Sequence, residues 1–126
     1  MRTADDYLPH IRKALATGGH MSIGRGGGSI QWLNDSGGRS SLSGFDPDFV
    51  KPLAIAAGLP VIDSRDLPLK TVWDLAVKGP MIAVPGDKPS KLLSDDGAPP
   101  YGSFDYAPLA YVAEAYRAAG ADVHNI

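Results

Sequence analysis

The sequence predicts a small α+β domain in which a glycine-rich antiparallel meander packs against three to four helices. Two observations carry this prediction. Apolar and polar residues alternate in short segments between residues 20 and 43, and helical spacing with capping residues precedes and follows that region. A chain of 126 residues is expected to form one domain, 1–126, with its own core. A small Rossmann-like α/β sheet is the alternative.

The first helix is expected from about residue 5 to residue 17. Thr3 and Asp6 have the spacing of a capping box. An apolar stripe at helical spacing follows, formed by Leu8, Ile11 and Leu15. Gly18 then provides the residue that ends the helix.

Three short strands are expected next, because the spacing of apolar residues changes to two. The candidate strands are 20–23, 29–33 and 39–43. Residues 24–28 and 34–38 separate them and consist mostly of glycine, asparagine, aspartate and serine. Such residues favour tight turns, so the simplest arrangement is an antiparallel meander.

A second helix is expected to begin at the pair Asp46-Pro47, which supplies an N-cap and a proline in the first turn. Pro52 is expected to break or kink this helix, because proline lacks the backbone N–H that a helix interior needs. Gly58 is expected to end it. Residues 61–63 are then expected to form a short strand.

A third helix is expected from Thr71, which with Asp74 repeats the spacing of a capping box. It is expected to end at the pair Gly79-Pro80, because glycine and proline terminate helices. The apolar run 81–84 then predicts a strand.

Residues 85–103 predict a long loop, because they hold five charged residues, four prolines and three glycines. A last helix stopped by Gly120 and a strand over 121–126 at the edge of the sheet are expected to follow. We expect one core, formed by Trp32, Leu42, Leu53, Val72, Ile82, Val84, Val112 and Val123.

Composition excludes several classes of partner and site. The formal net charge is −2, without the cluster of lysine and arginine that nucleic-acid backbones require. No stretch approaches about 18 consecutive apolar residues, so we expect a soluble cytoplasmic protein that uses no membrane. The chain has no cysteine, and its three histidines lack metal-ligand spacing, so neither a metal nor a cofactor is expected.

The segment Gly24-Arg25-Gly26-Gly27-Gly28-Ser29 departs furthest from average composition. Its glycines allow backbone N–H groups to converge on one point, and Arg25 can add a bidentate fork, which together suit a phosphate or carboxylate. The segment lacks the third glycine of a dinucleotide fingerprint and the Gly-Lys-Ser/Thr ending of a Walker loop. The alternative is a flexible hairpin tip with a solvated arginine.

A catalytic alternative centres on His20. A histidine on a strand can act as a base, Asp35 on a following turn can orient it, and Ser103 or a bound water can attack. Otherwise His20 is a partly buried strand residue. The polar segment 63–66 has a position where α/β proteins place catalytic groups, but a solvated turn with a local Asp–Arg pair is the favoured interpretation.

Two function classes follow from these patterns. The first is a binding module for an anionic small molecule or a protein partner, which would use Gly24–Ser29 and the 85–103 arm. The aromatic residues Tyr101 and Phe104 would anchor the partner. The second is a small hydrolase or group-transfer enzyme with His20 as base. A bacterial toxin or immunity protein fits either class, and the chain could also form a homo-oligomer.

Overall fold

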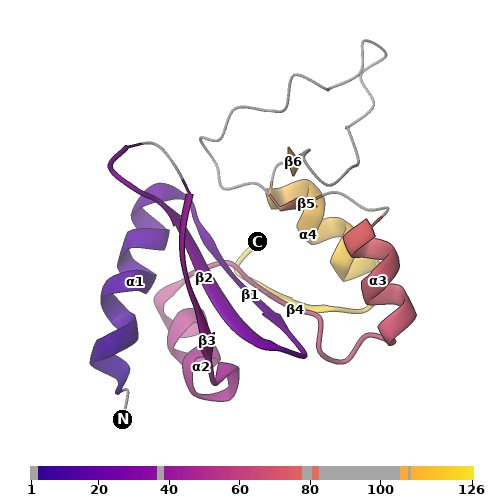
Figure 1. Ribbon diagram of the computed structural model, residues 1–126, viewed down its shortest axis with the longest axis horizontal. Helices are drawn as coiled ribbons and strands as arrows, with labels where there is room; N and C mark the ends of the chain where they lie inside the picture. Colours follow the sequence, from indigo (N-terminus) through magenta and orange to yellow (C-terminus); the bar gives the residue numbers. More distant parts are fainter. Residues whose placement is uncertain (1–2, 37–38, 78–80, 83–105, 108) are drawn as a thin grey trace.

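Five strands form one sheet in the order β3-β2-β1-β4-β7 (Figure 1). The computed structural model describes residues 3–36, 39–77, 81–82, 106–107 and 109–126. Its elements are α1 (Ala4–Thr17), β1 (His20–Gly24), β2 (Gly27–Leu33), β3 (Arg39–Phe45), α2 (Pro47–Ala57), β4 (Val61–Asp63), α3 (Leu69–Val77), β5 (Met81–Ile82), β6 (Tyr106–Ala107), α4 (Leu109–Ala118) and β7 (Asp122–His124).

The predicted α+β class is confirmed. Neighbouring strands in the five-stranded sheet are antiparallel, except for β1 and β4, which run parallel. The Rossmann-like alternative is wrong, because such folds are built mainly from parallel pairs. Strands β5 and β6 form a separate parallel pair. No helix in the described part of the chain is long and apolar enough to cross a membrane.

The predicted meander is β1, β2 and β3, with a shorter first turn than expected. Pairing between β1 and β2 continues as far as Gly24 and Gly27, so only Arg25 and Gly26 lie between the strands. Gly27 has a φ of 123°, a conformation that residues with a Cβ rarely adopt. Beside it, Gly28 leaves room for Phe45, because a Cβ at Gly28 would lie 2.4 Å from Cε1 of that ring.

Helix α1 begins and ends where its capping residues predict. The backbone N–H of Thr3 donates to Oδ2 of Asp6 at 2.6 Å, which is half of the capping box. Gly18 adopts the left-handed conformation after the last turn. The stripe prediction was partly wrong, because Ile11 is buried whereas Leu15 is 40% exposed.

Helix α2 starts at Pro47, where Oδ1 of Asp46 accepts from the backbone N–H of Asp48 at 3.0 Å. The predicted break at Pro52 is wrong, because the helix continues to Ala57. Pro52 is exposed and removes only one hydrogen bond, while Val50 and Ala54 pack into the core and hold the helix against the sheet.

The second half of the chain follows the prediction in outline. Helix α3 starts at Leu69, two residues before the predicted cap at Thr71. Strand β7 pairs with β4 at the edge of the sheet, as expected. The predicted 85–103 loop lies outside the described residues.

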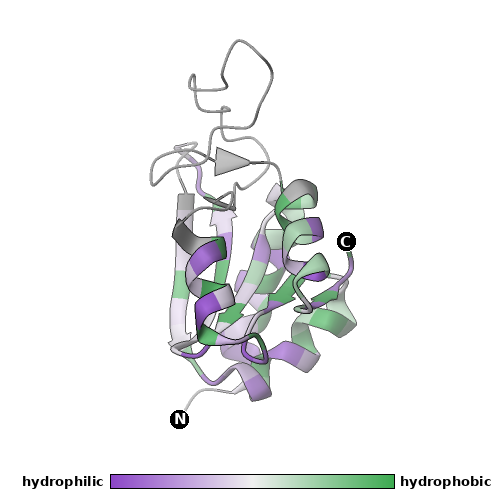
Figure 2. Cartoon of the chain, turned by 90° about the vertical axis from the view of Figure 1, so that its right-hand side faces the viewer, coloured by the Kyte–Doolittle hydropathy of each residue, from purple (hydrophilic) through white to green (hydrophobic). Residues whose placement is uncertain are grey.

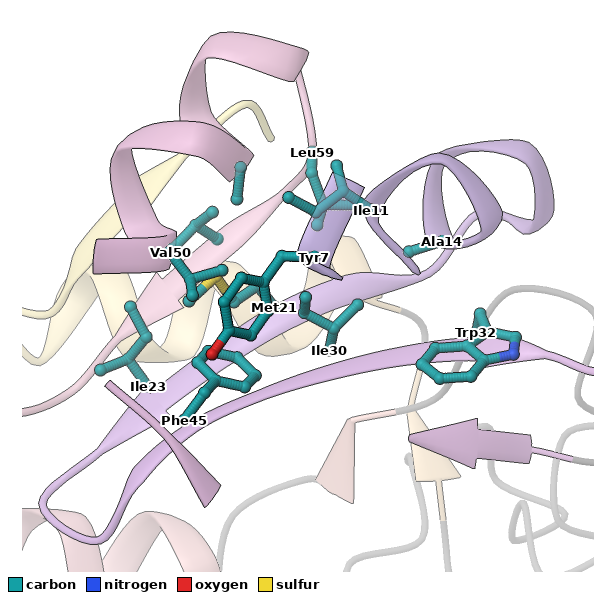
Figure 3. Packing of buried hydrophobic residues seen from close by; sticks show 12 residues of the cluster. Tyr7, Ile11, Ala14, Met21, Ile23, Ile30, Trp32, Phe45, Val50 and Leu59 are labelled. Atoms are coloured by element: carbon teal, nitrogen blue, oxygen red, sulfur yellow. The ribbon is translucent and has the colours of Figure 1, made fainter. Parts of the chain in front are cut away.

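Two clusters of apolar side chains lie on opposite faces of the sheet, so the prediction of one core is wrong. The first face carries Met21, Ile23 and Ile30 and is covered by α1 and α2 (Figure 3). On the second face, Ile62 of β4 packs against α4. The helices accordingly show bands of hydrophobic and hydrophilic residues (Figure 2).

The predicted core residues divide between these clusters. Trp32 is buried in the first cluster, against which Leu42 and Leu53 pack. Val123 packs against the second cluster. Val112 is fully buried and Val72 is half-buried. The side chains of Ile82 and Val84 are outside the described set.

Candidate functional site

The second face of β1, β2 and β3 is mostly polar, in contrast to the mostly apolar first face. Side chains alternate between the two faces of a strand, so the register of the strands shows which residues share a face. One row across the three strands is Ser22, Ser29 and Ser43, and the next row is His20, Gln31 and Ser41. We call these six residues the polar face.

The polar face begins on the central strand, where a polar side chain is least expected. Strand β1 lies third of five in the sheet. His20 has no exposed surface, and its Nε2 lies 3.1 Å from Oγ of Ser22, within hydrogen-bond distance. Burying an imidazole and a hydroxyl on a central strand costs free energy unless they are hydrogen-bonded. The pair therefore gives β1 a polar side that simple core packing does not require.

Gln31 lies directly opposite His20 in the ladder between β1 and β2. Its Oε1 atom is buried and accepts no hydrogen bond within the described part of the chain. An amide oxygen buried in this way costs about 1–3 kcal/mol. Gln31 therefore presents an acceptor that a hydrogen-bond donor from a ligand can satisfy.

Exposure rises steadily across the polar face. His20 is fully buried, Ser22 and Ser29 are half-buried, and Ser41 and Ser43 on β3 are exposed. Strand β3 is the edge strand on this side of the sheet. The polar side chains thus run from solvent at the sheet edge to a buried histidine at its centre.

Sequence reasoning identified His20 and Ser29 but missed Ser22, Gln31, Ser41 and Ser43. The available signal was the period of two, which puts these residues on one side of each strand. A polar side of a strand ordinarily faces solvent. Only the burial of His20 and of the Oε1 atom of Gln31 distinguishes this face from a solvated one.

Asp35 lies in the turn after β2 and is exposed. It is four residues beyond Gln31, about 13 Å along an extended chain, so the structure does not place it beside His20. Asp35 instead lines a shallow pocket of about 160 Å³ with Lys13, Thr17 and Trp32. The predicted nucleophile Ser103 lies outside the described residues.

The Gly24–Ser29 segment is divided between a turn and a strand. Arg25 is exposed, and its Nη2 donates to the backbone oxygen of Leu67 at 2.8 Å. Ser29 belongs to the polar face. The predicted partner anchors Tyr101 and Phe104 lie outside the described residues.

The predicted Asp–Arg pair at 63–66 is present, but Asp63 is buried rather than solvated. Arg65 donates from Nη2 to Oδ2 of Asp63 at 2.8 Å, and Lys51 donates from Nζ to the same oxygen at 2.7 Å. Burial alone raises the pKa of the Asp63 carboxyl, but the hydrogen bonds from Arg65 and Lys51 outweigh burial and lower that pKa to about 2. Asp63 is therefore an ionised structural group.

The same charged cluster continues to the last strand. Nζ of Lys51 also donates to Oδ2 of Asp122 at 2.8 Å, and Nε2 of His124 lies 2.8 Å from that oxygen. These contacts tie α2 to β4 and β7. All the charges in this cluster are paired with one another, so we assign it to stability rather than to ligand binding.

The described residues contain no group of three histidine, cysteine, aspartate or glutamate side chains placed to hold a metal ion. The polar face itself consists of neutral hydroxyl and amide groups and one imidazole. Such groups bind ligands by hydrogen bonds or transfer protons. Comparison of the chain with protein-family models, with curated proteins and with solved structures finds no match.

Proposed function

We propose that this chain is a binding module for a small hydroxylated anion, such as a hydroxy acid or a sugar phosphate, and that the polar face is its site. The observation that carries the proposal is the set of six polar side chains in two rows on one face of β1, β2 and β3. The rise in exposure toward β3 gives a ligand a route from the sheet edge to the buried histidine.

The hydrogen-bonding groups of the polar face match both parts of such a ligand. Serine hydroxyls can donate to the oxygens of a carboxylate or phosphate. The buried Oε1 of Gln31 can accept from a ligand hydroxyl, and this contact would recover much of the free energy lost by burying that oxygen unpaired. A ligand without hydroxyl groups would leave this acceptor unsatisfied.

Arg25 stabilises the turn in this proposal and does not bind the anion. Its guanidinium already contacts the loop after β4 through the oxygen of Leu67. Ser29 is the member of the Gly24–Ser29 segment that shares a face with His20 and Gln31. The anion is therefore expected to lie along the strands and not at the hairpin tip.

A thermal-shift screen tests this proposal. The panel is glucose 6-phosphate, glycerate, inorganic phosphate and uncharged glucose. A ligand present at about 100 times its Kd stabilises a protein by about 2.7 kcal/mol, which is several degrees for a chain of this size. We expect a shift with glucose 6-phosphate or glycerate and a smaller one with inorganic phosphate or glucose.

Four variants locate the site. Gln31→Met keeps the side-chain volume but removes the amide, and Ser29→Ala removes a hydroxyl. Each of these two variants should abolish the ligand-induced shift in melting temperature. Arg25→Ala and Lys13→Met change exposed cations away from the polar face and should preserve it. A shift that needs Arg25 but not Gln31 would move the site to the hairpin tip and contradict the proposal.

The same screen also tests the alternative in which the ligand is a protein. If no compound in the panel shifts the melting temperature, small-anion binding is refuted. The alternative is then a protein partner that binds through the 85–103 arm, with Tyr101 and Phe104 as anchors. Loss of partner binding in Tyr101→Ala and Phe104→Ala would support that alternative.

A further inference from the structure

Ser22 and His20 form a pair that binding alone does not explain. Nε2 of His20 lies 3.1 Å from Oγ of Ser22, and both side chains come from the same strand, two residues apart. His20 is fully buried, whereas Ser22 is half-buried. The hydroxyl therefore belongs to a residue that keeps some exposed surface, while the imidazole beside it has none.

We propose that Ser22 is a nucleophile activated by His20, which would make the polar face a site of acyl transfer from small carboxylic esters. Hydroxyl nucleophiles are weak until an adjacent base removes their proton, and a base within about 2.6–3.2 Å meets the geometric requirement. The catalytic pair is then Ser22 and His20, in place of Ser103 and His20.

Every proton and leaving group of the proposed reaction has a donor or an acceptor in the site or in the substrate. Oγ of Ser22 forms a bond to the ester carbonyl carbon, and its proton passes to Nε2 of His20. The bond from that carbon to the alkoxy oxygen breaks, and the proton on His20 is transferred to the departing alcohol. Water then attacks the acyl-Ser22 ester with His20 again as base, which releases the carboxylic acid and restores the hydroxyl.

The neighbouring strand supplies donors for the negative charge that develops on the carbonyl oxygen. Ser29 is directly opposite Ser22 in the ladder, and Gln31 is directly opposite His20. Side-chain hydroxyl and amide groups can stabilise such an oxyanion.

A fluorophosphonate probe tests the nucleophile directly. Attack by Ser22 forms an O–P bond and releases fluoride, while His20 takes the hydroxyl proton, so the protein gains the mass of the probe minus HF. We expect one adduct on the peptide that contains Ser22, together with hydrolysis of p-nitrophenyl acetate. Both readouts use the full chain.

The variants separate catalysis from structure. Ser22→Ala should lose the adduct and the hydrolysis, whereas Ser40→Ala should keep both. Ser40 is a matched control, because it is half-buried in the same sheet but lies on the first face opposite Trp32. His20→Gln should slow labelling at least about 100-fold, the contribution typical of a general base. Circular dichroism and melting curves check the fold of each variant.

Two results would overturn the inference: a folded wild-type chain with no adduct at Ser22, or labelling of Ser22→Ala at the wild-type rate. The first result does not depend on the folding of any variant. Because the inference goes beyond reversible binding, its failure is distinguishable from failure of the proposed function. Binding of glucose 6-phosphate without labelling would leave the binding module intact and remove only the catalytic role.

Discussion

Replacing Asp63 with asparagine tests whether the charged cluster stabilises the fold as its geometry indicates. The Asp63 side chain is only 7% exposed and contacts both Lys51 and Arg65. Asp63→Asn keeps the size of the side chain but removes its charge, so two cations lose their shared anion. Because Lys51 keeps Asp122 and Arg65 keeps Asp48, the cost should lie below the value of about 3–5 kcal/mol that is typical of a buried charge left without a partner.

The pH dependence of this loss follows from the pKa of Asp63. The hydrogen bonds from Arg65 and Lys51 prevail over burial and lower the pKa from its ordinary value of 3.8 to about 2. This difference corresponds to about 2 kcal/mol. Because the folded-state pKa is the lower one, this stabilisation is present above about pH 4 and is lost as the pH falls toward 2.

Urea unfolding of the wild type and Asp63→Asn at pH 7 and at pH 2.5 measures the effect. We expect the variant to be less stable at pH 7, and the difference in free energy of unfolding to shrink by about 2 kcal/mol at the lower pH. Asp66→Asn is the matched control, because Asp66 is exposed and lies in the turn after β4, three residues beyond Asp63. A difference that does not change with pH would refute the reasoning.

Three further predictions concern single side chains. Gly28→Ala should lower the free energy of unfolding in urea by about 1–3 kcal/mol, because the new Cβ would press on the buried ring of Phe45. Gly26→Ala is its control: a Cβ there meets open space, so the free energy of unfolding should change by less than about 1 kcal/mol. Gln31→Met should leave the melting temperature of the ligand-free protein unchanged or raise it, because it removes an unpaired buried amide oxygen; a clear drop would contradict the assignment of that oxygen as unpaired. Asp46→Ala should cost about 1 kcal/mol in urea unfolding through loss of the cap of α2, and an unchanged midpoint would count against that cap.

Local signals in the sequence were enough for most elements of the fold. The capping pair Thr3 and Asp6, the Asp46-Pro47 start and the glycines after α1 and α2 act on neighbouring residues, so they determine helix ends without tertiary contacts. Local rules failed at Pro52. There the packing of α2 against the sheet outweighs the hydrogen bond that proline removes.

The candidate site was less predictable than the fold. His20 and Ser29 stood out from the sequence, but their neighbours depend on which strand lies beside which and in what register. The predicted strand end at residue 33 is confirmed, but the sequence did not show which residue of β2 lies opposite His20. Because β2 extends to Leu33, Asp35 is carried past the site, whereas Gln31 lies opposite His20.

The sequence by itself determined the α+β class, the meander, the starts of α1 and α2, and the alternation that separates a polar from an apolar side of each strand. These features follow from the chemistry of residues within a few positions of one another. Only the tertiary structure decided that β1 is the central strand, that His20 is buried against Ser22, and that Asp63 receives Lys51 from another element. The reason is physical: burial and charge pairing depend on residues far apart in the chain, whose positions are set by how strands and helices pack.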